Sequence, residues 1–253
     1  MVLQPISSFV PAVATRQVNR LVGFGVVPVL RCAVLVSAIW GGMGAAWAAC
    51  SDPPHAGVDW TACEKVRLVL RSANLAGARL AGTDMNGTDL QGANLTGADL
   101  THASVDRARL SGADLSRAKL VQLNAYRANM AGSKLVGADL TKAEMARANL
   151  ASADLSRANL RKAELQRTNL EDSKLDGANL TATDLARTNF SKASLDGTRM
   201  ALARTYRTRF EGVDLSAVIG LTQSQLESSC GDAATRLPAR LKQPKRWPCG
   251  KDD

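Results

Sequence analysis

Arginines recur at an interval of 20 residues through the middle of the chain, and their side chains are suited to binding anions. The positions are Arg107, Arg127, Arg147, Arg167, Arg187 and Arg207. The guanidinium group binds carboxylate and phosphate oxygens in a forked geometry. If residues 20 apart stack, neighbouring guanidinium groups lie about 4.8 Å apart and repel by about 1 kcal/mol in water. A polyanion or an acidic partner would relieve that repulsion, so the column predicts an anion-binding surface.

A purely structural explanation of the column stays open. Asparagines follow two residues after four of the arginines, at Asn129, Asn149, Asn169 and Asn189, with Arg109 and Arg209 at the ends of their column. Stacked asparagines pass amide hydrogen bonds from one side chain to the next. Carboxylates also lie three residues before three of the arginines, at Glu144, Glu164 and Asp184. In this explanation the arginines pair with these carboxylates across a corner of the fold, and repeat duplication produced the column.

Catalytic and metal-binding motifs are not indicated by the residue types. Only two histidines are present, His55 and His102, and the chain contains neither an H-E-x-x-H motif nor a phosphate-binding loop. The many aspartates, such as Asp84 and Asp99, recur with the repeat described below and lack the G-G-x-G-x-D pattern of calcium-binding β-rolls. We therefore expect no enzyme activity, no metal and no cofactor.

Five-residue units are the elements that position these side chains. From Arg71 the chain reads RSANL AGARL AGTDM NGTDL QGANL TGADL, and it continues to EGVDL at Leu215. The fifth residue is Leu, Met or Phe except at Val105, Ala125 and Thr205, and the third is Ala, Ser or Thr except at Leu123 and Val213. A period of five fits neither an α-helix nor the alternation of a strand. It fits a backbone that turns inward once per unit.

These units resemble the pentapeptide-repeat family, whose unit A-[DN]-L-x-x is seen here as ANL, ADL, TNL and TDL. The resemblance covers residues 71–215 and implies an all-β fold, a right-handed quadrilateral β-helix with four units per coil. Residues 20 apart then stack, and the large and small residues of each unit point inward. About 29 units would make about seven coils, a rod about 35 Å long. Phe190 and Phe210, one coil apart, are predicted to stack.

The ends of a solenoid expose unpaired edges and need covers. We expect residues 49–70 to form an N-terminal cap and residues 216–253 a C-terminal cap. In the C-terminal cap, Thr222 and Gln225 have the capping-box pattern, which predicts a short helix ending near Gly231, followed by a proline-rich tail. Rods of this family sometimes pair end to end, which makes a homodimer through a solenoid end one alternative.

Residues 1–48 have the composition of a secretion signal. Three arginines precede an apolar run over residues 32–39, and Ala46-Trp47-Ala48 is an A-x-A cleavage pattern. One alternative is a membrane anchor through residues 32–49. Another is a lipoprotein linked at Cys50, although Trp47 stands where a lipobox has Leu. We expect cleavage, and with it a periplasmic or secreted protein.

The cysteines agree with export. After the loss of residues 1–48, two cysteines remain on each side of the repeats, and an even number in an oxidising compartment indicates disulfides. We expect the pairs Cys50–Cys63 and Cys230–Cys249, each closing a cap. The same loss leaves 29 Lys and Arg against 23 Asp and Glu, a formal charge of +6, compared with +9 for the whole chain. A basic chain favours anionic partners.

These features predict a non-catalytic extracytoplasmic scaffold or binding module that engages an acidic protein or an anionic envelope polymer along the arginine column. The best-understood members of the pentapeptide-repeat family mimic DNA and engage gyrase through an acidic surface, so an intracellular gyrase-interacting protein is the alternative. The positive charge differs from that of a DNA mimic, and the expected leader would separate the chain from nucleic acid. A secreted structural rod without a ligand is the third interpretation.

Overall fold

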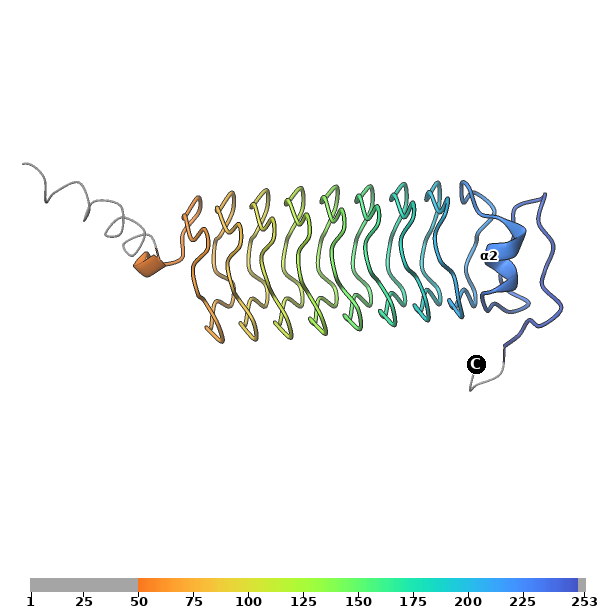
Figure 1. Ribbon diagram of the computed structural model, residues 1–253, viewed down its shortest axis with the longest axis horizontal. Helices are drawn as coiled ribbons and strands as arrows, with labels where there is room; N and C mark the ends of the chain where they lie inside the picture. The colour runs from red at the N-terminus through yellow and green to blue at the C-terminus, as the bar shows by residue number, and fades with distance from the viewer. Residues whose placement is uncertain (1–49, 250–253) are drawn as a thin grey trace, which may run out of the picture. The chain divides into compact units, whose positions relative to one another are not determined.

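The computed structural model describes residues 50–249, which form a solenoid held together by parallel bridges. Up to Ile219 each bridge joins a residue to the one 20 positions later, as Asn129 joins Asn149, and the last two bridges span 21 and 22 positions, Arg209 to Cys230 and Asp214 to Arg236. Bridges at successive five-residue steps lie on successive sides, so the solenoid has four sides. Figure 1 shows the coils stacked along one axis, with the helix α2 (Gln223–Glu227) at the C-terminal end. The signal peptide expected over residues 1–48, and the alternative anchor, lie outside the described residues.

Every bridge of the solenoid is isolated, and residues 50–249 contain no extended strand. The five-residue unit explains this, because a two-residue turn at each corner leaves only one residue per side in bridging position. The predicted four-sided β-helix is therefore built from corners and single bridges rather than from a conventional sheet.

Backbone hydrogen bonds run along the axis of the solenoid. The N–H of Leu150 donates to the carbonyl of Asn169 in the next coil at 2.7 Å, and the N–H of Asn149 donates to the carbonyl of Ala128 in the preceding coil at 2.9 Å. Within the corner, the N–H of Ala153 donates to the carbonyl of Leu150 at 3.1 Å. The same pattern recurs in most units, so main-chain groups that would be costly to bury unpaired are satisfied by the neighbouring coils.

The interior is filled by one large and one small side chain per unit. Leu150 and Ala148 are both buried, and so are Leu123 and Ala125 of the unit in which the large and small positions are exchanged. The exchange keeps the volume within one side nearly constant, which a close-packed core tolerates. The rings of Phe190 and Phe210 stack with centroids 5.6 Å apart, as their 20-residue spacing predicts.

The solenoid begins earlier than the pattern of Leu, Met and Phe indicated. Residues 59–70, expected to belong to the N-terminal cap, already carry bridges to the next coil. They place Trp60, Lys65 and Leu70 in the buried centre positions. The repeat is therefore longer at this end than residues 71–215, and within the described part of the chain residues 50–58 precede its first bridge.

Lys65 occupies a buried centre position because two neighbours accept its ammonium group. The Nζ atom lies 4.0 Å from the centroid of the Trp60 ring and donates a hydrogen bond to the carbonyl of Cys50. Burial lowers the pKa of Lys65, and the nearby carboxylate of Asp52 partly opposes the shift. A charged residue at a centre position breaks the hydrophobic pattern, so a search for that pattern does not recognise the unit.

The C-terminal cap contains α2 and covers the last coil. Thr222 accepts from the N–H of Gln225, and the Gln225 side chain accepts from the N–H of Thr222, which completes the predicted capping box. The Gln225 amide also donates to the carbonyls of Met200 and Ala203, at 2.9 and 2.8 Å. The helix ends at Glu227 rather than near Gly231, because the chain returns to the bridge between Cys230 and Arg209.

Both predicted disulfides are present. Cys50 pairs with Cys63, with Cα atoms 5.5 Å apart, and Cys230 pairs with Cys249, with Cα atoms 5.4 Å apart. The first ties the residues before the solenoid to its first coil. The second fixes the tail against the C-terminal cap, where the buried ring of Trp247 packs against Gly231.

Candidate functional site

The six predicted column arginines lie along one corner of the solenoid, which we call the arginine corner (Arg107, Arg127, Arg147, Arg167, Arg187 and Arg207). They share the second turn position of their units, where φ lies between 54° and 61°. This left-handed conformation favours glycine, and glycine does occupy the same position at Gly97 and Gly137 on another corner. The turn geometry therefore does not explain why arginine recurs at six successive coils.

The carboxylates of the structural explanation do not pair with the arginine corner. Asp184 accepts from Arg204, one coil later, at 2.6 Å, and not from Arg187. Among the ion pairs of residues 50–249, none includes Glu144 or Glu164, and none includes Arg107, Arg127, Arg147, Arg167 or Arg187. These five arginines are exposed, so their guanidinium groups are accessible to an anion.

Asparagine side chains form a ladder on the side that follows the arginine corner. Asn149 donates to the Oδ1 atom of Asn129 at 3.2 Å, Asn169 to that of Asn149 at 3.4 Å, and Asn189 to that of Asn169 at 3.2 Å. The ladder expected in the structural explanation therefore exists. It does not involve the arginines, so it stabilises the wall without occupying the guanidinium groups.

The ladder also changes what the surface offers to a ligand. The Oδ1 atom of Asn149 accepts from Asn169 and from the backbone N–H of Ala151 at 3.2 Å, so both of its lone pairs are used inside the protein. Its amide nitrogen donates one hydrogen to Asn129 and keeps a second. Together with the guanidinium groups, the ladder therefore presents hydrogen-bond donors with few free acceptors. Such a surface suits anionic oxygen atoms.

No carboxylate lies on this side between the coils of Arg107 and Arg147. The residues there beyond the arginine corner are Arg109, Ser111, Gly112, Asn129, Ala131, Gly132, Asn149, Ala151 and Ser152. The following corner carries only small residues in these coils. Acidic residues return only at Glu171 and Asp172.

The arginines at the two ends of the asparagine ladder are neutralised. Arg109 lies 2.8 Å from the buried carboxylate of Asp89, and Arg209 lies 3.1 Å from Glu211. Burial would raise the pKa of Asp89, but hydrogen bonds from Arg71, the Gln91 N–H and Arg109 outweigh it and lower the pKa. Arg109 is therefore structural.

On another side of the solenoid, acids and bases alternate along a column and pair. On the side opposite the asparagine ladder, Asp59 pairs with Arg79 at 3.4 Å and Asp99 with Lys119 at 3.8 Å. These contacts lie between coils, so opposite charges in one column neutralise each other. The arginine corner lacks this alternation, so Arg107, Arg127, Arg147, Arg167 and Arg187 have no carboxylate at the same position in the neighbouring coils.

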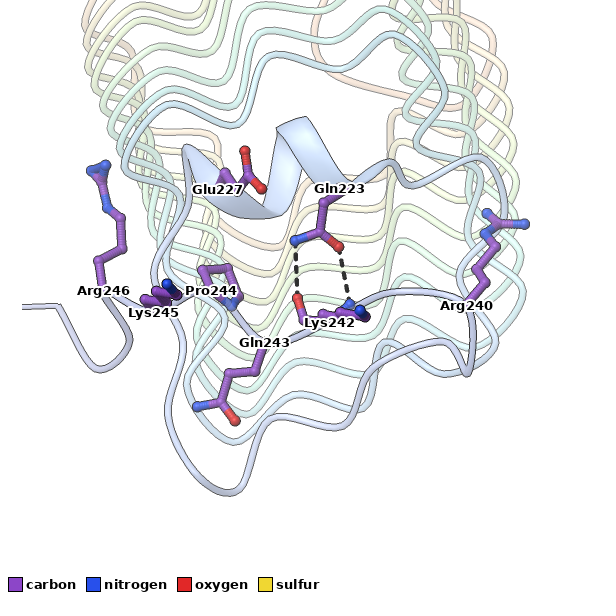
Figure 2. A pocket seen from close by; sticks show the side chains of 8 residues that line it. All are labelled: Gln223, Glu227, Arg240, Lys242, Gln243, Pro244, Lys245 and Arg246. Atoms are coloured by element: carbon purple, nitrogen blue, oxygen red, sulfur yellow. Dashed lines mark hydrogen bonds between the residues drawn. The ribbon is translucent and has the colours of Figure 1, made fainter.

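A basic cavity lies at the C-terminal cap (Figure 2). It was not predicted from the sequence. Its volume is about 670 Å³, and it is lined by Gln223, Glu227, Arg240, Lys242, Gln243, Pro244, Lys245 and Arg246. The amide of Gln223 holds the tail there, donating to the carbonyl of Lys242 at 3.1 Å and accepting from its N–H at 3.0 Å. The one feature of the sequence that could have indicated this cavity is the cluster of basic residues over residues 240–246.

The described residues do not assemble a metal centre. Within residues 50–249, no three His, Cys, Asp or Glu side chains gather closely enough to hold an ion. His55 and His102 are both exposed, and His102 occupies a left-handed corner position with φ of 58°. No helix in this part of the chain has the length and apolarity of a membrane span.

The chain matches the family model described as "Pentapeptide repeats" in eight copies, and the matched segments include residues 69–107, 93–130, 108–147, 126–161, 163–201 and 175–216. No curated protein matches.

Solved structures of pentapeptide-repeat proteins are similar to this chain. A trypsin-treated variant of QnrB1, a plasmid-mediated fluoroquinolone resistance protein, has 20% identity and a TM-score of 0.56, over 69% of this chain and 84% of that one. HetL, a pentapeptide repeat protein involved in heterocyst differentiation regulation from the cyanobacterium Nostoc sp. strain PCC 7120, has 25% identity and a TM-score of 0.47, over 82% and 93%. At 20% identity, the likeness to QnrB1 shows the fold alone.

Proposed function

The chain belongs to the pentapeptide-repeat family, and from this we propose that it is a non-catalytic extracytoplasmic binding module whose arginine corner holds an anionic envelope polymer or an acidic protein. The observation that carries the proposal is that five arginines of the column are exposed and make no ion pair within the described residues, namely Arg107, Arg127, Arg147, Arg167 and Arg187. The asparagine ladder beside it presents donors, and the side that carries the ladder has no carboxylate from Arg109 to Ser152, whereas Asp106 and Glu144 lie on the other side of the column.

The geometry favours a partner that extends along the axis. Arginines one coil apart are separated by about 4.8 Å, so successive charges face a ligand at a regular interval. Mutual repulsion of the guanidinium groups falls when an anion lies between them. An elongated polyanion gains such contacts at several coils at once, whereas a single small anion gains them at one.

Export is supported by the two disulfides and by the composition of residues 1–48. Disulfides persist in oxidising compartments and are rare in the cytosol. Both disulfides close the ends of the solenoid, at Cys63 and Cys230, where unpaired coil edges need covering. The proposed site of action is therefore the periplasm or the exterior of the cell.

Binding to a polyanion tests the proposal. The variant carries Arg127→Gln, Arg147→Gln and Arg167→Gln, and the matched control carries Arg117→Gln, Lys142→Gln and Arg157→Gln, three cations at the same left-handed turn position on other corners. Inorganic polyphosphate is the probe, over a range of salt concentrations. We expect the first variant to lose affinity and salt dependence, because fewer counter-ions are released on binding. Equal losses in both variants would show that only net charge matters and would overturn the proposal.

The alternative is an intracellular gyrase-interacting protein, in keeping with the fold shared with QnrB1. A supercoiling assay with purified gyrase distinguishes the two functions. We expect no effect of the oxidised protein at concentrations that saturate polyphosphate binding. Specific inhibition or protection of gyrase, unaffected by the three arginine substitutions, would favour the alternative.

A further inference from the structure

A notch interrupts the arginine corner at its N-terminal end. Because the solenoid starts earlier than expected, the column continues backwards from Arg107 through Gly87 to Arg67, which has the same left-handed backbone with φ of 56°. Gly87 has no side chain, so the column has a gap between two arginines. The gap opens into a cavity of about 280 Å³ lined by Val66, Arg67, Asn86, Gly87, Asp106, Arg107 and Tyr126.

The polar groups of the notch include both donors and acceptors. Asn86 Oδ1 accepts from Ser104 Oγ and from the N–H of Asp106, both at 2.7 Å, and within residues 50–249 its amide nitrogen donates to no partner. The carboxylate of Asp106 accepts from the N–H of Tyr126 at 2.8 Å and from Asn124 at 3.4 Å. A carboxylate has about four lone-pair sites, so Asp106 can accept further hydrogen bonds.

The notch also has an aromatic wall. Tyr126 lines it and is half-buried, and the guanidinium carbon of Arg127 lies 5.2 Å from the centroid of its ring. Arg67 and Arg107 are exposed and belong to no ion pair of the described residues. An aromatic ring, two open guanidinium groups, a free amide donor and a carboxylate acceptor therefore surround one small cavity.

We propose that this notch binds one anionic saccharide unit, a sugar ring that carries a carboxylate. The C–H face of a sugar packs on an aromatic ring, its hydroxyl groups need acceptors as well as donors, and its carboxylate pairs with arginine. Tyr126, Asp106 with Asn86, and the two arginines meet these three needs. A bare phosphate chain would use only the donors, and no hydroxyl group of it would donate to Asp106 to offset the repulsion that any anion meets there. The inference rests on the proposed function and specifies its polymer as a polysaccharide.

The repeat itself supplies a substitution that fills the notch. Gly87→Arg places arginine at a position where seven residues of the same column already hold it, with φ between 54° and 61°. A Cβ atom at Gly87 would approach only Arg67 Cγ, at 3.3 Å, and that side chain is exposed and flexible. We therefore expect the variant to fold.

A matched control exists on another corner. Gly137 lies between Arg117 and Arg157, one coil from each, so it is also a gap between two arginines at left-handed positions. Its preceding turn position carries Ser116, Val136 and Ser156 in the three coils, so an aromatic ring and a carboxylate are lacking there. Gly137→Arg adds the same charge in the same backbone setting without touching the notch.

Two probes of equal charge distinguish binding at the notch from binding along the arginine corner. They are a hexamer of galacturonic acid and a linear polyphosphate, and their affinities are measured by calorimetry at fixed salt. We expect the native protein to bind the galacturonate hexamer about tenfold more tightly than the polyphosphate, because only the sugar uses the aromatic and acceptor groups. Gly87→Arg should weaken binding of the hexamer and strengthen binding of polyphosphate. Gly137→Arg should not shift the affinities for the two probes in opposite directions, because it leaves the notch unchanged.

Asp106→Asn and Tyr126→Ala complete the test. Both should reduce the preference for the hexamer, and Asp106→Asn should also improve polyphosphate binding, because it removes a negative charge. A Gly87→Arg variant that binds both probes more tightly would overturn the notch assignment. If the native protein shows no preference while the three arginine-to-glutamine substitutions weaken both probes, the notch fails and the proposed function stands. If those substitutions affect neither probe, the proposed function fails.

Discussion

The carboxylate of Asp184 lies 2.6 Å from the guanidinium group of Arg204, 20 residues later in the chain, and does not pair with Arg187, three residues away. Stacked residues of one column are about 4.8 Å apart and extend in parallel, so their side chains meet easily. A pair across a corner must join side chains that leave the solenoid in different directions. Where one column holds both signs, as at Asp184 and Arg204, the charges pair within that column. Arg107, Arg127, Arg147, Arg167 and Arg187 have no carboxylate in their column, and their guanidinium groups stay accessible.

Export and oxidation predict the covalent state of the protein. We expect the chain recovered from the periplasmic fraction to begin at Ala49 and to be four hydrogens lighter than its fully reduced form, since two disulfides are present. Intact mass before and after reduction measures both features. A full-length, reduced chain in the cytoplasmic fraction would contradict the proposed compartment.

Gly231 is expected to be the most sensitive glycine of the C-terminal cap. A Cβ atom there would lie 2.4 Å from the ring of Trp247, so Gly231→Ala should displace the ring and lower the free energy of unfolding by about 1–3 kcal/mol. Trp247 also donates to the carbonyl of Ser229 at 2.8 Å, a bond that the displacement would break. Chemical denaturation and tryptophan fluorescence measure the effect.

Gly112→Ala is the control for Gly231→Ala. At Gly112 a new Cβ atom would meet nothing within 4 Å, and φ is +68°, so only the cost of the left-handed conformation remains, about 1 kcal/mol. Fluorescence should stay unchanged in this variant. Equal behaviour of the two variants would refute the packing account of the cap.

Asn149→Ala tests the asparagine ladder. The substitution removes the donor to Asn129, the acceptor for Asn169 and the acceptor for the N–H of Ala151. We expect the free energy of unfolding to fall by about 1–3 kcal/mol, because partners are left unsatisfied in a half-buried site. A double-mutant cycle with Asn169→Ala should show coupling between the two sites. Strict additivity would mean that the ladder does not act as a connected network.

Acid should weaken the solenoid through carboxylates that are hydrogen-bonded at its corners. The hydroxyl and the backbone N–H of Thr101 donate to Asp99, and with Lys119 they outweigh the opposing effect of burial, so the pKa of Asp99 lies below 3.8. A lowered pKa means that this stabilisation is present above the unfolded-state pKa and is lost as the pH falls through the folded-state value. Asp99→Asn should therefore flatten the decline in unfolding free energy below about pH 4.

Asp172→Asn provides the comparison for Asp99→Asn, because Asp172 is exposed and its side chain has no hydrogen bond within the described residues. Its curve of unfolding free energy against pH should follow that of the native protein. If both variants flatten the curve equally, general charge rather than the corner hydrogen bonds governs the acid response.

Much of the solenoid could be predicted from the sequence because its contacts are strictly periodic. A large residue and a small residue at fixed places in each five-residue unit define the inward positions, as at Leu150 and Ala148. The 20-residue interval then places Phe190 against Phe210 and Asn149 against Asn169 without knowledge of any other contact. The capping box at Thr222 could also be predicted, because its hydrogen bonds join residues that are close in the sequence.

Departures from the repeat could not be predicted in this way. Trp60 and Lys65 belong to the first coil although they break its hydrophobic pattern, and only the position of the Cys50 carbonyl and the Trp60 ring explains a buried lysine. The notch at Gly87 could not be predicted either, because the hydrophobic pattern does not indicate that the column continues to Arg67.

By itself, the sequence determined the coil, the stacking of its columns and the existence of an arginine column, since each follows from spacing along the chain. The tertiary structure decided which of those charges are accessible, how far the coil extends and how the tail forms a basic cavity at the cap. These outcomes depend on competition between side chains that are distant in sequence. Asp184 could face either Arg187 or Arg204, and the axial stacking of the coils selects Arg204.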